Sequence, residues 1–182
     1  MLAYLFVFFA VAMRMPFTHP WNFTPVAAAL LYFGARGARR QLWIPFALLA
    51  ASDVLLTKFA YSYPFSWDHF VTWAWYAAIL WLGTNLRESA ALPDKMACLR
   101  VAGASLASSL SFFLVSNFAV WACWNMYPKT FTGLITSYAA AIPFFRRGIA
   151  GDLLFTVVFF GLSALAARLA RNSKTHGSPA AA

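Results

Sequence analysis

The chain has 182 residues, of which 62% are hydrophobic and 10% are charged. A soluble domain has roughly 45–50% apolar and about 25% charged residues, so the composition excludes an ordinary soluble domain and indicates an integral membrane protein. The net charge is +9, because 14 Lys and Arg residues outnumber 5 Asp and Glu residues. The basic residues are scattered between apolar segments, which is typical of loops that meet anionic lipid and argues against nucleic-acid binding.

Seven apolar stretches follow one another along the chain, at residues 2–15, 24–36, 42–58, 69–86, 98–118, 130–143 and 148–170. A spanning helix needs about 20 apolar residues. The stretch 130–143 is shorter than this and ends at Pro143, which suits a re-entrant or interfacial helix. We therefore expect an all-α polytopic membrane protein with about six transmembrane helices. It would form a single membrane domain over residues 1–171, followed by a disordered cytoplasmic tail over residues 172–182.

The distribution of basic residues predicts an orientation. If the N-terminus is cytoplasmic and 130–143 does not cross, nine basic residues lie inside and five outside; if it crosses, the split is eight against six. The positive-inside rule favours the first arrangement, with both termini cytoplasmic. The inner group is Arg36, Arg39, Arg40, Arg87, Lys95, Arg100, Arg168, Arg171 and Lys174, and the outer group is Arg14, Lys58, Lys129, Arg146 and Arg147.

One carboxylate lies inside an apolar stretch. Asp53 is flanked by apolar residues on both sides in the segment LLAASDVLL. A carboxylate at such a position is costly unless it is paired or protonated, and it usually faces a cavity or a partner. We therefore expect Asp53 to be buried and paired, with Arg14, His19 or backbone amides of residues 16–25 as candidate partners.

Other polar residues allow two interpretations each. Asp152 is expected at the start of the last helix, where it is either a charge favoured by the helix dipole or part of a polar site. Asp68 is expected to cap the helix over 69–86. Asn22 and Thr24 lie in the proline-broken segment HPWNFTPV. This segment either lines a cavity at membrane depth or is a surface loop in which Thr24 caps the next helix.

Small and aromatic residues also follow patterns. In 98–118, small residues recur at a spacing of four residues. The pairs are Gly103 with Ala107, Ala104 with Ser108 and Ser105 with Ser109. This spacing favours close packing within the chain over an interface with a partner protein. Aromatic residues gather on the outer side, among them Trp121 and Trp124. Most are typical of an interfacial belt, while two or three of them could stack around a flat ligand.

Several kinds of chemistry have no motif in the sequence. It contains no P-loop, no HExxH and no GxSxG, so we expect no enzymatic activity and no cofactor. Cys98 and Cys123 are 25 residues apart, which favours neither a disulfide framework nor a metal site. His19 and His69 could ligate a haem or a chlorophyll, although lone histidines are more often simple hydrogen-bonding residues.

Four segments resemble a family of uncharacterised bacterial membrane proteins that are regarded as transport proteins. They are HPWNFTPVAAALLYFGA (19–35), LLAASDVLL (48–56), SSLSFFLVSNFAVW (108–121) and YPKTFTGLITSYAAAIPFFRRGIAGDLLFT (127–156). The resemblance covers roughly residues 1–165. That family is in turn distantly similar to the substrate-binding S components of energy-coupling-factor (ECF) vitamin transporters.

The resemblance implies a six-helix protein of the bacterial inner membrane with an outward-facing pocket. In S components the loops after helices one, three and five close this pocket, and here these are the segments near 16–23, 59–68 and 119–147. A membrane T component and two cytoplasmic ATPases would drive transport. The first helix departs from the Ala-x-x-x-Ala docking face of S components, because Val7 and Arg14 follow Ala3 and Ala10 at that spacing.

We therefore expect a membrane protein that binds a small solute for uptake. The expected ligand-binding residues are Asn22, Asp53, Asn117, Trp121, Asn125, Arg146 and Asp152, with Trp121 stacking on the solute. Because the outer half carries more positive than negative charge, the solute is expected to be flat and neutral or weakly anionic. Two alternatives stay open. One is a structural or accessory subunit of a membrane complex, with a haem or pigment; the other is a membrane-embedded enzyme that acts on lipid.

Overall fold

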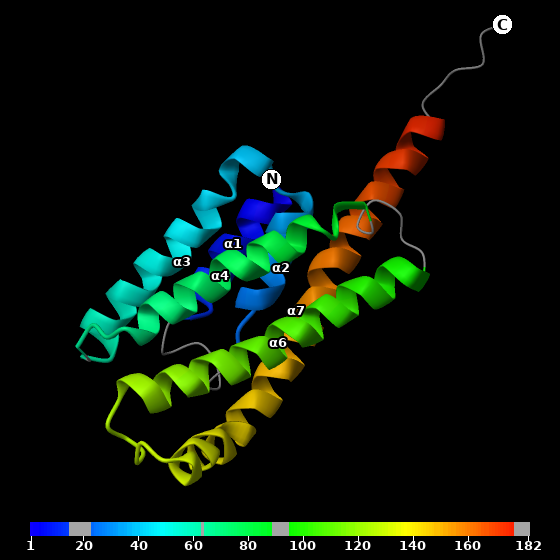
Figure 1. The fold of residues 1–182 in the computed structure, drawn as a ribbon. Helices are drawn as coiled ribbons and strands as arrows, with labels where there is room; N and C mark the ends of the chain where they lie inside the picture. The colour runs from blue at the N-terminus through cyan, green and yellow to red at the C-terminus, as the bar shows by residue number, and fades with distance from the viewer. Residues whose placement is uncertain (15–22, 63, 89–94, 177–182) are drawn as a thin grey trace, which may run out of the picture.

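The computed structural model describes residues 1–14, 23–62, 64–88 and 95–176. Its elements are α1 (Leu2–Ala12), α2 (Val26–Arg36), the 3-10 helix η1 (Arg39–Gln41), α3 (Trp43–Leu55), the π-helical turn η2 (Leu56–Ala60), α4 (Asp68–Thr84), α6 (Lys95–Cys123) and α7 (Phe131–His176). The described residues contain no strand, which confirms the expected all-α class. Figure 1 shows α3 and α4 connected as one helical hairpin and α6 and α7 as another.

Three helical segments among the described residues are long and apolar enough to cross a membrane. They are Arg39–Ala60, Lys95–Cys123 and Phe131–Ala170. The outward surface is apolar as well: Phe8, Trp81 and Val157 are 72%, 67% and 70% exposed. Apolar surface on this scale is unfavourable in water, so the helices indicate a membrane protein. The helices α1 and α2 are also apolar, but each has only 11 residues.

The centre of the bundle is α2, in which every residue except Arg36 is buried. It packs against α1, α4, α6 and α7. It crosses α4 at two glycines. A Cβ atom on Gly34 would lie 2.4 Å from the Leu80 carbonyl oxygen, and one on Gly83 would lie 2.5 Å from the Leu31 carbonyl oxygen. The two backbones therefore touch, and only glycine permits this approach.

Aromatic rings hold α1 and α2 against α7. The ring of Phe6 stacks on that of Phe159 with 3.9 Å between centroids, and it meets the ring of Tyr32 edge-on at 4.9 Å. Tyr32 also meets Phe160 edge-on, at 5.1 Å. Aromatic pairs within about 7 Å stabilise a contact beyond their buried area. The inner face of the short helix α1 is thereby fixed in the bundle.

The small residues of α6 pack mainly within the chain, as the sequence predicts. Ala104, Ser105, Ser108 and Ser109 are buried. The hydroxyl of Thr156 on α7 donates to Ser105 Oγ over 3.1 Å, so the packed face also carries a polar contact. The third pair, Gly103 with Ala107, lies on the exposed side of α6 instead.

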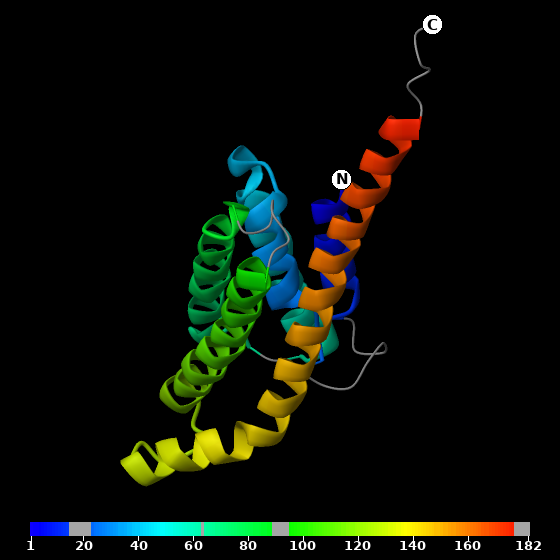
Figure 2. The same cartoon turned by 90° about the vertical axis from the view of Figure 1, so that its right-hand side faces the viewer.

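The last helix differs from the sequence interpretation. No break separates 130–143 from 148–170, because α7 continues through Pro143 to His176. Proline in a helix removes one backbone hydrogen bond and kinks the helix without always ending it. Figure 2 shows that α7 bends within its yellow part, and Pro143 lies inside this helix. The helix also reaches into the segment expected to form a tail, and residues 177–182 lie outside the described chain.

Candidate functional site

A cavity of about 550 Å³ lies in the half of the bundle that carries the α3–α4 and α6–α7 connections. Its lining includes Thr24 just before α2, Tyr61 just after η2, Asn117 on α6 and Ala141 on α7. This is the half in which the family resemblance places a pocket. Residues of two of the three expected closing segments line it, and the third segment lies almost entirely outside the described residues.

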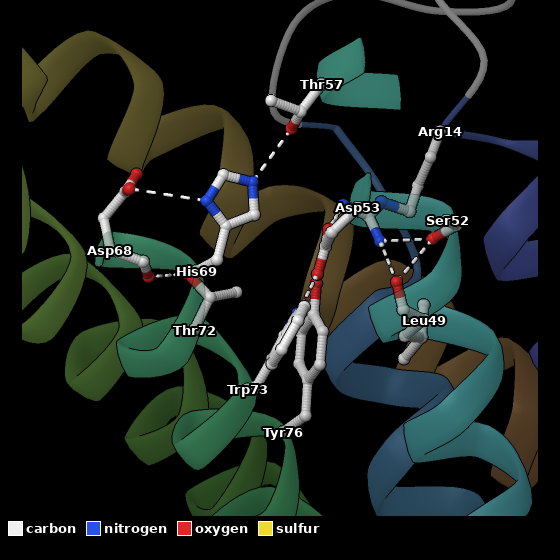
Figure 3. Close-up of polar contacts among 10 residues, drawn as sticks. All are labelled: Arg14, Leu49, Ser52, Asp53, Thr57, Asp68, His69, Thr72, Trp73 and Tyr76. Carbon is white, nitrogen blue, oxygen red and sulfur yellow. Dashed lines mark hydrogen bonds and ion pairs between the residues drawn. The ribbon is translucent and has the colours of Figure 1, made fainter. Parts of the chain in front are cut away.

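The most tightly bonded group in the cavity wall is centred on Asp53 (Figure 3). Its Oδ1 forms an ion pair with the Arg14 guanidinium and accepts a hydrogen bond from the Tyr76 hydroxyl at 3.3 Å. Its Oδ2 accepts a hydrogen bond from Trp73 Nε1 at 3.0 Å. Asp53 is only 7% exposed. The prediction that Asp53 is buried and paired is therefore confirmed, with Arg14 as the partner.

Arg14 binds α3 through more than the carboxylate. Its Nη1 donates to Ser52 Oγ over 2.8 Å and to the Leu49 carbonyl oxygen over 3.4 Å. Ser52 in turn donates to that same carbonyl over 2.7 Å. The network joins the end of α1 to α3, and through the two aromatic donors to α4. We interpret it as a frame that shapes the cavity, because Arg14, Trp73 and Tyr76 all donate to the one Asp53 carboxylate.

The second carboxylate of the cavity, Asp152, has a different environment. It lies in the middle of α7, so the alternative of a helix N-terminal charge is wrong. Its Oδ2 accepts a hydrogen bond from the Ser109 hydroxyl at 2.6 Å. No basic side chain of the described residues pairs with it, and its Oδ1 has no hydrogen-bond partner among them. A carboxylate inside a membrane bundle with one neutral donor is a candidate for binding a ligand.

Asn117 and several rings complete the described cavity wall. Asn117 Nδ2 donates to the Phe113 carbonyl oxygen over 2.7 Å, which leaves the amide oxygen available. Phe113 stacks on Phe145 with 4.4 Å between ring centroids, and both line the cavity together with Trp75. The sequence offered no motif for these rings, because any apolar helix presents aromatic residues to its neighbours.

Three of the expected ligand-binding residues lie away from this cavity. Trp121 donates through Nε1 to the Pro128 carbonyl oxygen over 2.9 Å, and Lys129 binds the Trp121 carbonyl and lies over its ring. Trp121 therefore closes the α6–α7 connection and does not stack in the cavity. Asn125 and Arg146 are exposed and do not line the cavity either. A fourth, Asn22, lies outside the described residues.

His69 is held by contacts at both ring nitrogens. Nε2 lies 2.9 Å from Thr57 Oγ1, and Nδ1 lies 3.1 Å from the Ser66 carbonyl oxygen and 3.4 Å from Asp68 Oδ1. A haem or pigment at His69 would have to break one of these contacts. No group of three metal-ligating side chains occurs in the described part of the chain. His19, the other candidate axial ligand, lies outside it.

Two expected helix caps are not formed. The helix α4 begins at Asp68 itself, with Trp67 in the capping position, and no side chain caps its first turn. The helix α2 follows Pro25, and Thr24 makes no capping hydrogen bond. Pro25 occupies the capping position itself, so Thr24 lies one residue too early to cap the helix, and proline has no side-chain acceptor to offer. Thr24 lines the cavity instead.

Comparison with known proteins identifies a family but no activity. A family model described as a family of unknown function, DUF6580, matches residues 1–175. No curated protein matches the chain, and no solved structure does. The match agrees with the expected membership of an uncharacterised family. It gives no support to the further likeness to transport proteins or to S components.

Proposed function

Because the chain belongs to DUF6580, a family without an assigned function, we propose a role from its cavity: this membrane protein binds a small solute for uptake. The observation that carries the proposal is a cavity with carboxylate and amide groups inside a bundle whose outer surface is apolar. Ionisable groups within a membrane bundle are costly, and those that face a cavity commonly mark a binding site. A volume of about 550 Å³ lies within the usual range of roughly 300–1,000 Å³ for pockets that bind small molecules.

The short helix α2 supports this proposal. Eleven residues rise about 16 Å, which is half of a hydrocarbon core of about 30 Å. Such a helix leaves backbone groups unpaired at membrane depth, and this is tolerated where they line a cavity. The first residues of α2, Val26 and Ala27, line the cavity described here. Half-helices that end at a binding site are typical of membrane transporters.

The direction of uptake rests on the orientation of the bundle. Seven basic residues of the expected inner group lie near the helix ends opposite the cavity: Arg36, Arg39, Arg40, Arg87, Lys95, Arg100 and Arg168. If that end is cytoplasmic, the cavity lies in the outer half. We propose a six-span topology in which the short helices α1 and α2 each reach only about half-way through the core, with the part of α7 before Pro143 lying along the interface. A straight α7 of 46 residues would be about 69 Å long, far beyond a membrane core.

Labelling of introduced cysteines tests this orientation. In a background with Cys98 and Cys123 replaced by Ser, we expect Arg147→Cys to react with a membrane-impermeant maleimide on intact cells. We expect Arg39→Cys to react only after the cells are permeabilised. The reverse pattern would contradict the six-span arrangement and the direction of uptake, while leaving solute binding to be judged separately.

A partnership with a T component and ATPases stays a proposal. S components dock through small residues on the first helix. Here Ala3, Val7 and Ala10 are buried within the bundle. The exposed face of α1 presents Leu5 and Phe8 instead. Any energy-coupling partner would therefore bind a different surface, and co-purification from native membranes would detect it.

Mass spectrometry of small molecules released from gently purified protein tests solute binding. We expect one compound to be enriched over an unrelated membrane protein prepared in parallel. Ser116→Trp should lose this compound, because Ser116 lines the cavity and an indole would fill much of it. The matched control is Ala107→Trp on the exposed side of the same helix, which should retain it. No enrichment, or equal retention in both variants, would contradict the proposal.

A further inference from the structure

The charge inside the cavity differs from the charge around it. Lys58, Lys129, Arg146 and Arg147, which make the outer half positive, do not line the cavity. Its charged lining residues in the described chain are Arg14, Asp53 and Asp152. Arg14 and Asp53 form an ion pair and balance one another. The remaining ionisable lining group is the Asp152 carboxyl, which no basic side chain of the described residues pairs with, so the count over the whole outer half does not describe the cavity itself.

Asp152 has acceptor sites that no hydrogen bond among the described residues fills. An ionised carboxylate has about four acceptor sites. Within the described residues, Asp152 receives one hydrogen bond, from Ser109, whereas Asp53 receives bonds from Arg14, Trp73 and Tyr76. The Arg14 guanidinium is meanwhile engaged by Asp53, Ser52 and the Leu49 carbonyl oxygen. An anionic solute would meet no free cation in this lining, whereas a cationic group would meet an incompletely bonded carboxylate.

The remaining walls favour a positive charge as well. Aromatic rings line the cavity on three helices, from Trp75 and Tyr76 on α4, Phe112 and Phe113 on α6, and Phe144 and Phe145 on α7. The face of an aromatic ring attracts a cation, more strongly where water is displaced. Asn117 adds an amide oxygen that can accept a hydrogen bond from an N–H group. A carboxyl group in a cavity lined by aromatic rings is suited to an ammonium group attached to an apolar body.

We propose that the cavity binds a small organic cation whose ammonium group pairs with Asp152 and whose apolar body lies among the aromatic rings. This inference rests on the proposed function and specifies the chemical class of the solute. The Asp152 carboxylate sets the charge of the ligand, and the Asp53 network holds the wall in place without contributing a free charge.

Three phenyl probes of similar size test the proposal by calorimetry on the full chain in phosphatidylcholine nanodiscs. Phenethylamine carries an ammonium group, 2-phenylethanol is neutral and phenylacetate is anionic. With empty nanodiscs as the blank, we expect phenethylamine to bind at least about tenfold more tightly than the alcohol. Phenylacetate should bind least well. Equal or tighter binding of the neutral or the anionic probe would overturn the proposal, and so would a lack of binding by all three.

Two variants locate the effect. Asp152→Asn keeps the shape of the side chain and an oxygen that can accept from Ser109, and it should abolish the preference for phenethylamine over the alcohol. Asp68→Asn removes a carboxylate outside the cavity and should leave the preference unchanged. A preference retained in Asp152→Asn would refute the assignment. The charge of the compound that is enriched during purification separates this inference from the proposed function. A neutral or anionic compound would support solute binding but overturn the inference that the solute is a cation.

Discussion

The two carboxylates of the cavity show how one bundle uses the same chemical group in two ways. Asp53 on α3 is paired with Arg14 and bonded by two aromatic donors, so that three helices meet around it. Asp152 on α7 has one neutral donor and no cationic partner in the described chain. The contacts of Asp53 hold α3 against α4 and the end of α1, whereas Asp152 keeps acceptor sites that a ligand could use. The number of donors around an acid that lines the cavity thus separates a structural role from a binding role.

Breaking the Asp53 network gives the largest expected effect. Asp53→Asn removes the charge partner of Arg14, and an uncompensated buried charge is destabilising by about 3–5 kcal/mol. We expect a large fall in the melting temperature of the detergent-solubilised protein. Replacing both partners with apolar side chains, Arg14→Met with Asp53→Leu, should recover a large part of it. A double variant as unstable as the single one would show that the network contributes more than a charge pair.

The helix crossing behind this network gives the next effect. Gly34→Ala places a Cβ atom against backbone atoms of α4, and we expect a loss of about 1–3 kcal/mol in stability because backbone cannot yield as a side chain can. The matched control is Gly103→Ala, where the added Cβ meets nothing within 4 Å. Thermal unfolding of the two variants should differ clearly. Equal stability would mean that α2 and α4 do not approach as closely as described.

Removing the charge of Asp152 gives the smallest effect on stability. Asp152 is half-buried at the cavity wall, so its carboxylate is less cut off from water than that of Asp53, and Asp152→Asn keeps an oxygen that can accept from Ser109. We therefore expect the free energy of unfolding to change by at most about 1 kcal/mol in either direction. Thermal unfolding without added solute is the measurement. A loss as large as that of Asp53→Asn would place Asp152 in the structural frame and remove the contrast between the two acids.

Local sequence pattern was enough to predict some of this arrangement. The apolar stretches predicted the helices, and the isolated Asp53 in LLAASDVLL predicted a buried pair with Arg14 among its candidates. The small-residue spacing on α6 predicted packing within the chain for two of its three pairs. In each case a strong physical penalty, such as an unpaired charge in lipid, leaves few solutions.

Tertiary contacts decided the rest. The sequence predicted that a helix ends at Pro143, yet α7 continues through this residue. Asp152 therefore lies in the middle of a helix and not at the expected helix start. Trp121 looked available for stacking, but its indole is bonded to Pro128 across the α6–α7 connection. Trp75 is one of the rings that do line the cavity, and no sequence pattern distinguishes these rings from other aromatic residues. Which side of a helix faces a cavity depends on distant segments that local patterns do not encode.

Native mass spectrometry of the intact protein released from nanodiscs tests the central claim most directly. The parent chain should carry a bound small molecule, and Ser116→Trp, with its cavity filled, should not. Asp152→Asn should lose the same bound mass while keeping the melting temperature of the parent. A bound mass that persists unchanged in both variants would contradict the account, because it would place the ligand outside the cavity and leave Asp152 without the role assigned to it.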